Sequence, residues 1–428
     1  MSETTGTGTP EGLQRRLGPA DAVVIGLGSM LGAGIFVALA PAAGAAGSGL
    51  LIGLAVAAIV AYCNASSSGR LAARYPVSGG TYVYGRERLG EFWGYLAGWC
   101  FVVGKTASCA AMALTVGLYA WPEQAHAVAV AAVVLLTAVN YRGIQKSALA
   151  TRIIVAVVLA VLAAVVVAGS NSGSAEATRL GFGTDITVGG VLQAGGLLFF
   201  AFAGYARIAT LGEEVREPAR TIPRAISMAL GITLLVYLAV AAVALLVLGP
   251  RGLAEATAPL SSVVTAAGVE WLEPVVRAGA VVAALGSLLA LVLGVSRTTF
   301  AMARDRHLPH ALAAVHPRFA VPHRAELAVG VIVAVVAATA DVRAAIGFSS
   351  FGVLVYYALA NASAWTLPDG GRRGRIIASL GLAGCLALAF TLPGSSVLTG
   401  AAVIAVGGLI YATRRRFTSQ PRPVEPQR

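Results

Sequence analysis

The stretch Gly26-Leu27-Gly28-Ser29-Met30-Leu31-Gly32-Ala33-Gly34-Ile35-Phe36 decides the fold, because it places four glycines within nine residues of an apolar run. Glycine in a helix interior is less favourable than alanine by about 1 kcal/mol. Where such a run spans a membrane, freed backbone groups are tolerated only beside a cavity. We therefore expect a broken helix here. The alternative is an unbroken helix that uses Gly28 and Gly32 as a small-residue packing face.

The composition of the whole chain indicates a membrane protein. Of 428 residues, 57% are hydrophobic and 12% are charged, against about 25% charged in an ordinary soluble domain. A soluble fold of this length could not bury so much apolar surface, and a disordered chain would need low hydrophobicity. The composition therefore predicts an all-α polytopic membrane protein in contact with the lipid bilayer.

Apolar runs of about 20 residues, the length that crosses a bilayer, recur along the chain about twelve times. The fourth, ninth and twelfth runs are short, so eleven spans is the alternative. The runs cover residues 21–40, 48–69, 91–120, 125–139, 150–169, 188–211, 227–248, 271–302, 325–340, 345–364, 375–391 and 397–413.

The distribution of basic residues predicts the orientation. The net charge is +12, and the arginines fall in small clusters between apolar runs, as the positive-inside rule requires of a membrane protein. This pattern argues against a nucleic-acid partner. With a cytoplasmic N-terminus, the outer loops receive only Arg179, Arg251, Arg277 and Arg343. We expect both termini in the cytoplasm, disordered tails at residues 1–19 and 417–428, and a location in the cell membrane.

A second break is expected in the sixth run, where small residues alternate with aromatic ones across residues 197–207. An aromatic core stripe is the alternative. Interrupted helices at corresponding places in two halves of a chain indicate a transporter's substrate site. The N-terminus of a half-helix suits a carboxylate, and the free carbonyls at a C-terminus suit an ammonium group.

Four stretches resemble the amino acid–polyamine–organocation (APC) superfamily, in order and over most of the chain. The first is the glycine-rich run, and the second is Arg74-Tyr75-Pro76-Val77-Ser78-Gly79-Gly80-Thr81-Tyr82. The third contains Glu213-Glu214-Val215-Arg216-Glu217-Pro218 and Ile222-Pro223-Arg224-Ala225-Ile226. The fourth contains Ser296-Arg297, Phe300-Ala301-Met302-Ala303-Arg304-Asp305 and Leu308-Pro309.

This resemblance implies a transporter domain over residues 20–416 with a five-plus-five inverted repeat. The repeats would cover residues 20–169 and 188–364, and two further helices would cover residues 375–413. It also implies secondary transport of amino acids or related amines, with Phe200 as an aromatic gate and Glu213 and Glu214 paired with cytoplasmic arginines. The substrate-binding residues it implies are Ser29, Met30, Gly32, Ala33, Gly34 and Ile35 for the carboxylate side, and Phe199, Ala201, Phe202, Ala203 and Gly204 for the amino side.

Two positions depart from the pattern of the family. Many members carry a glutamate where this chain has Arg70, and some proton-coupled members carry a helix-five lysine where this chain has Val158. The second departure puts proton coupling by a helix-five lysine in doubt.

Two charges inside the apolar runs are candidates for function. Lys105 lies 14 residues after Glu91, about 21 Å along a helix, where a lysine is expensive and usually functional. It could couple transport to protons or contact a substrate carboxylate; the alternative is an inert lysine held by carbonyls. Arg207 shares a helical face with Glu214, which predicts a salt bridge, with a substrate-facing arginine as the alternative.

Other functions have weaker support. A channel or receptor with many spans is one alternative, but the sequence shows no selectivity filter or ring of acids, which a channel would need. It also shows no nucleophile or metal motif, which an intramembrane enzyme would need. Met30 is the one residue of the broken segments that supports a carrier of divalent metals. No acidic residue lies in the two broken segments, which favours a neutral amino acid over a polyamine. We expect no cofactor or bound metal, and the loop that contains His307, His310, His316 and His323 is expected to be solvated.

The sequence leaves the choice between proton coupling and exchange open. Ser287 and Ser296 are candidate hydroxyls for a sodium site.

Overall fold

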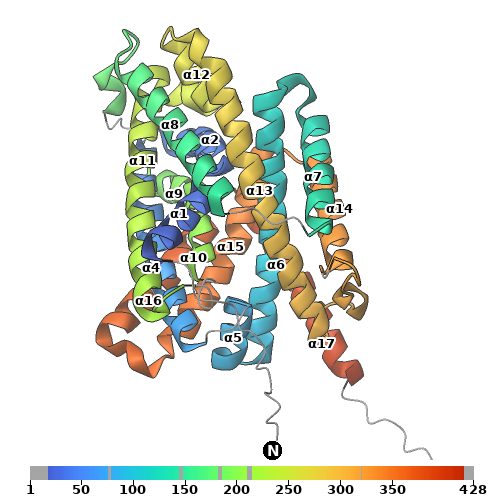
Figure 1. The fold of residues 1–428 in the computed structure, drawn as a ribbon. Coiled ribbons are helices and arrows are strands. Elements are labelled where there is room, and N and C mark those ends of the chain that lie inside the picture. The colour runs from blue at the N-terminus through green and yellow to red at the C-terminus, as the bar shows by residue number, and fades with distance from the viewer. Residues whose placement is uncertain are drawn as a thin grey trace, which may run out of the picture.

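A computed structural model describes residues 18–75, 79–143, 148–181, 186–209, 215–319 and 321–418, which form a bundle of helices (Figure 1). The helices of the first half are α1 (Pro19–Met30), α2 (Ala33–Val37), α3 (Leu39–Ala46), α4 (Leu50–Arg74), α5 (Thr81–Leu89), α6 (Glu91–Ala120), α7 (Ala125–Tyr141) and α8 (Ala148–Ser170). Those of the second half are α9 (Val188–Phe202), α10 (Ala206–Ala209), α11 (Pro218–Glu255), α12 (Pro259–Ala266), α13 (Glu273–Arg304), α14 (His323–Thr339), α15 (Val342–Trp365), α16 (Gly371–Thr391) and α17 (Gly394–Thr418).

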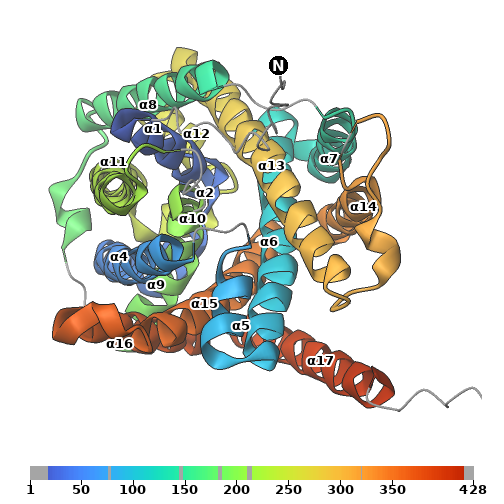
Figure 2. The ribbon, with the colours of Figure 1, turned by 60° about the horizontal axis from the view of Figure 1, so that its bottom comes forward.

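Eleven segments of the described residues are long and apolar enough to cross a membrane. This confirms a polytopic membrane protein. By length and composition the number of spans within the described residues is eleven, the lower of the two expected numbers. The expected ninth run forms α14, which has 17 residues, at the short end of the range for a spanning helix. It packs beside α7 at one edge of the bundle (Figure 2).

The long helices surround a core that contains the short ones. α6 packs against α13 and α15, while α4 packs against α9 and α11. Figure 2 shows α2 and α10 in the interior of this arrangement, whereas α16 and α17 lie on its outside. The glycine-rich segment is therefore enclosed by protein, where freed backbone groups can be tolerated.

Buried polar groups hold α4 and α15 together. The side-chain amide of Asn361 donates to Asn64 Oδ1 at 2.6 Å, and Ser67 Oγ donates to Asn361 Oδ1 at 2.7 Å. All three side chains are fully buried. Hydrogen bonds of this kind stabilise helix pairs in a bilayer, where apolar contact alone gives little driving force.

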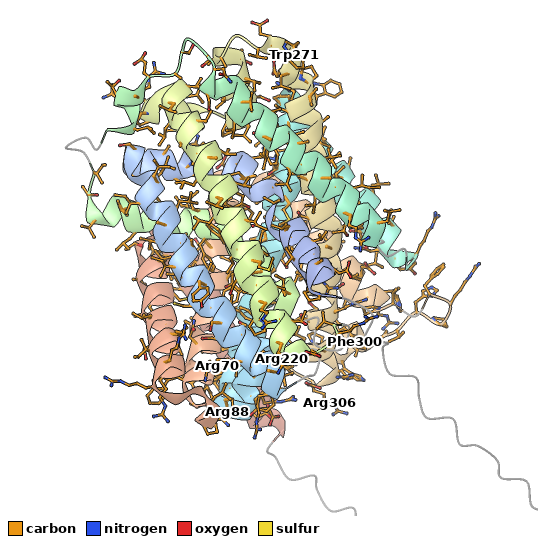
Figure 3. The ribbon with its side chains drawn as sticks, turned by 60° about the vertical axis from the view of Figure 1, so that its left-hand side comes forward. Arg70, Arg88, Arg220, Trp271, Phe300 and Arg306 are labelled. Atoms are coloured by element: carbon orange, nitrogen blue, oxygen red, sulfur yellow. The ribbon has the colours of Figure 1, made fainter. Side chains whose placement is uncertain are left out.

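Several arginines gather toward one end of the bundle (Figure 3). Figure 3 places Arg70, Arg88, Arg220 and Arg306 toward one end and Trp271 at the other. At the basic end, Arg88 donates to both the hydroxyl and the carbonyl oxygen of Thr366, which ties α5 to the end of α15.

Candidate functional site

The first membrane helix is broken at the glycine-rich run, as expected. α1 ends at Met30, Leu31 has φ −75° and ψ 51°, and Gly32 has φ −103° and ψ −149° before α2 begins at Ala33. The Gly32 amide turns back to donate to Met30 O at 2.7 Å. Ala38 remains in the right-handed helical region, so that α2 runs on into α3. The first amide groups of α2 therefore form a half-helix N-terminus inside the bundle.

The sixth helix is broken within the expected 197–207 region, toward its C-terminal side. α9 continues through Phe202, and Ala203–Tyr205 form a 3₁₀ turn before the short α10. Phe199, Ala201 and Phe202 thus lie in the last turn of α9. A helix end of this kind presents backbone carbonyls that the helix itself leaves without partners.

The two breaks lie in direct contact, because glycines let the backbones meet. A Cβ atom added at Gly34 would lie 2.6 Å from Ala201 Cα, and one added at Gly204 would overlap the carbonyl group of Ser29. The contacts of α1 with the 3₁₀ turn and of α2 with α9 agree with this. The N-terminus of α2 and the C-terminus of α9 therefore lie side by side in the interior of the bundle.

Tyr237 of α11 lies against both breaks, a role that the sequence analysis missed. Its hydroxyl lies 2.5 Å from Met30 O and 3.2 Å from Ala201 O, close enough to donate to either carbonyl. The tyrosine is fully buried. A buried tyrosine usually needs a partner for its hydroxyl, so its position within an apolar run was the available signal.

Lys105 of α6 reaches the break in the sixth helix. Its Nζ atom donates to Ala203 O at 3.3 Å, and the side chain is only 6% exposed. This carbonyl belongs to the turn that follows α9. The lysine thus lies beside the break in the sixth helix. A hydrogen bond to a backbone carbonyl agrees both with a functional lysine and with an inert lysine held by carbonyls.

The three phenylalanines at the end of α9 have different surroundings. The ring of Phe199 contacts Tyr357 edge-on at 5.8 Å, and the ring of Phe202 contacts Tyr237 at 5.2 Å. Within the described residues, Phe200 has no aromatic ring contact, and it is 7% exposed whereas the other two are fully buried. Phe200 is therefore the least restrained of the three rings.

The remaining predicted residues are placed as follows. Ser287 is buried on α13, with its hydroxyl against Gly32 and no hydrogen-bond partner among the described residues. Ser296 Oγ donates to Leu293 O within its own helix. Arg207 is exposed on α10, and its expected partner Glu214 lies, like Glu213, outside the described residues.

The loop that contains the histidines is less solvated than expected, and His307 is the clearest correction. The hydroxyl of Tyr82 lies 2.7 Å from Asp305 Oδ2 and 2.8 Å from His307 Nδ1. Arg86 pairs with Asp305 at 3.0 Å, and His307 Nε2 lies 3.7 Å from Glu91. This network ties α5 and α6 to the end of α13. Residues far apart in the sequence supply the partners, so the loop composition alone could not reveal it.

We expect acid to destabilise the protein through His307. Burial of the imidazole lowers the pKa of His307, and the carboxylates of Glu91 and Asp305 oppose this shift. Below pH of about 6.5, the usual value for histidine, the unfolded chain binds more protons at this residue than the folded chain does. Stability therefore falls as the pH falls through this window. Thermal unfolding of His307→Asn between pH 7.5 and 5.5 should show a smaller decline than the parent protein.

The matched control for this experiment is His310→Asn, because His310 is exposed in the same loop. It should decline with acid as the parent does. An identical decline in His307→Asn and the parent would contradict the assignment.

Comparison with known proteins adds a family match. The model of the family described as "Amino acid permease" matches residues 17–413 of this chain. That range includes both broken helices and all the helices from α1 to α16.

Three relatives illustrate the range of similar proteins. The "Uncharacterized transporter Rv1999c" of Mycobacterium tuberculosis is 73% identical over 417 residues, which cover 97% of this chain and 95% of the relative. The "Branched-chain amino acid permease BcaP" of Bacillus subtilis is 28% identical, over 93% of this chain and 88% of its own. The "Methylthioribose transporter" of Bacillus subtilis is also 28% identical, over 93% of each chain.

Proposed function

The chain belongs to the amino acid permease family and is a membrane transporter, and from this premise we propose that it carries amino acids across the cell membrane by alternating access. The observation that carries the proposal is the contact between the two broken helices. The start of α2 and the end of α9 meet through Gly34 and Ala201, so the first amide groups of one helix and the last carbonyls of the other lie side by side.

A zwitterion fits these two ends. The positive end of the α2 dipole and its free amides at Ala33, Gly34 and Ile35 suit a carboxylate. The carbonyls at the end of α9 and at Ala203 suit an ammonium group, and Lys105 already places an ammonium-type nitrogen at Ala203 O. A substrate could thus be held by backbone groups, with its side chain free to vary.

We favour a neutral amino acid as the substrate. Residues 29–35 and 199–205 contain no acidic side chain for a second ammonium group, and Lys105 would repel one. The name of the relative BcaP, a branched-chain amino acid permease, agrees with this class. The relative named for methylthioribose makes a sugar substrate the second candidate, and a polyamine is disfavoured by the same lysine.

Lys105 is the proposed coupling group. A substrate ammonium group at the end of α9 would compete with the lysine for the same carbonyl, and two cations in a low-dielectric site repel each other strongly. Loss of a proton from Lys105 would relieve this repulsion, so binding and proton movement would be linked. Exchange of one substrate for another is the alternative, in which the incoming ammonium group replaces the outgoing one.

The proposal includes an orientation and an internal repeat. The basic end shown in Figure 3 would face the cytoplasm, because basic residues concentrate on that side of membrane proteins. Both termini would then be cytoplasmic. The helices from α1 to α8 and from α9 to α15 would form the two five-helix repeats, with α16 and α17 added after them.

Uptake into proteoliposomes tests this function. We expect one class of radiolabelled neutral amino acid to accumulate, with an inward proton gradient increasing the rate. Uptake only into vesicles preloaded with amino acid would instead establish exchange. Transport of methylthioribose, spermidine or ethanolamine, with no amino acid transported under either condition, would overturn the amino acid assignment.

Phe200→Ala should weaken substrate retention more than it weakens the fold. Removal of a gating ring raises the apparent KM for uptake, and we expect a rise of roughly tenfold, equivalent to about 1.4 kcal/mol. Phe199→Ala is the contrasting variant, because that ring is fully buried against Tyr357 and its loss should cost about 3–5 kcal/mol of stability. An unchanged apparent KM in Phe200→Ala would show that this ring is not the gate.

A further inference from the structure

An open groove of about 520 Å³ lies along the beginning of α16, far in the sequence from both broken helices. Its volume is within the range of small-molecule sites. The groove is lined by Gly371, Arg372, Arg375, Ile376, Ser379 and Leu380.

The lining residues occupy one exposed face of α16. Positions 372, 375, 376, 379 and 380 follow the three-and-four spacing of a single helical face. Ile376 and Leu380 are 48% and 58% exposed. Figure 2 shows α16 at the outer edge of the bundle, and α16 is one of the candidate membrane spans. In a bilayer this face meets lipid rather than water.

The side chains that the structure describes offer no salt-bridge partner to the two arginines of the groove, Arg372 and Arg375. The guanidinium of Arg375 lies 5.8 Å from the ring centre of Trp365, which is 51% exposed. An exposed tryptophan beside arginines at the end of a spanning helix is typical of the membrane interface. Two cations at that depth favour an anionic partner.

We propose that this groove binds an anionic phospholipid. The phosphate lies between Arg372 and Arg375, and one acyl chain follows Ile376 and Leu380 toward the centre of the bilayer. Ser379 lies about 10 Å beyond Arg372 along the helix, at the depth of the glycerol esters. Basic pockets beside spanning helices bind anionic headgroups in this way. The proposal is independent of the transported substrate.

Quenching of Trp365 by brominated lipids tests the proposal. The full-length protein is placed in nanodiscs that contain a minority of brominated phosphatidylglycerol or of brominated phosphatidylcholine. The Trp365→Phe variant, measured in parallel, isolates the signal of this tryptophan from the other four. We expect phosphatidylglycerol to quench Trp365 more strongly, with a preference of about fivefold per arginine, the equivalent of about 1 kcal/mol each.

The double variant Arg372→Gln/Arg375→Gln should remove the preference, so that the two lipids quench equally. The matched control is Arg74→Gln/Arg373→Gln, which removes the same charge from exposed positions outside the groove. It should keep the preference. Transport need not be measured in either variant, so failure of the proposed transport function would leave this result intact.

Three results would overturn the proposal. Equal quenching of Trp365 by the two lipids in the parent protein would by itself contradict the proposal. This measurement does not depend on whether the arginine variants fold. A preference that survives in Arg372→Gln/Arg375→Gln would place the lipid elsewhere. Equal quenching by the two lipids together with a change in Trp365 fluorescence on adding inorganic phosphate, a change absent from Arg372→Gln/Arg375→Gln, would identify a soluble anion as the ligand.

Discussion

Gly204→Ala should reduce transport strongly. A Cβ atom at this position would overlap the carbonyl group of Ser29, and both partners are backbone atoms that no side-chain rotation can move. The break in the sixth helix would have to withdraw from the first helix. Overpacking of this kind costs about 1–3 kcal/mol, and misplacement at the site adds to it, so we expect uptake to fall by at least about tenfold. Proteoliposome uptake at saturating substrate measures the effect.

The matched control for Gly204→Ala is Gly231→Ala on α11, where an added Cβ atom meets nothing within 4 Å. It should transport normally and unfold at the same or a higher temperature, because alanine is the better helix former. Gly34→Ala should behave like Gly204→Ala, since its Cβ atom would lie 2.6 Å from Ala201 Cα. Normal transport in Gly204→Ala would show that this contact between the broken helices is dispensable.

Lys105→Met should remove the pH dependence of uptake. Methionine has a similar length but carries no proton, and the lysine it replaces is buried with its Nζ atom on Ala203 O. If proton movement at Lys105 is linked to substrate binding, uptake by the variant should be the same across pH 5.5–8 and unaffected by a proton gradient. Initial rates of uptake at several pH values, with and without the gradient, measure this.

Thr106→Val is the control for Lys105→Met. Thr106 is the next residue of α6, equally buried, and its hydroxyl bonds only to Val102 O of its own helix. It should keep the pH dependence of the parent. Uptake that stays pH-dependent in Lys105→Met would show that the lysine does not couple transport to protons. If that variant also unfolds at a lower temperature, the lysine serves as a structural anchor for the turn at Ala203.

The two predictions together separate the parts of the site. Gly204→Ala disturbs the approach of the two backbones that would hold the substrate, whereas Lys105→Met leaves that approach intact and removes only a titratable group. A variant with normal pH dependence and low uptake therefore reports on binding, and one with normal uptake and no pH dependence reports on coupling.

Much of the fold followed from the sequence because a bilayer imposes simple rules. Spanning helices must be long and apolar, and the composition and spacing of the runs therefore predicted a polytopic bundle, which the structure confirms. The break at Gly32 was predictable for a local reason, since closely spaced glycines weaken a helix wherever it lies.

Only the tertiary structure decided which side chains meet at the breaks. Tyr237 and Lys105 reach carbonyls of Met30, Ala201 and Ala203 across gaps of 36 to 207 residues in the chain. The same is true of His307, whose partner Tyr82 lies 225 residues earlier. Local sequence determines where a helix forms and where it weakens, because those energies depend on neighbouring residues. Local sequence does not determine which face of a distant helix will pack against a given residue, because that depends on how all the helices pack together.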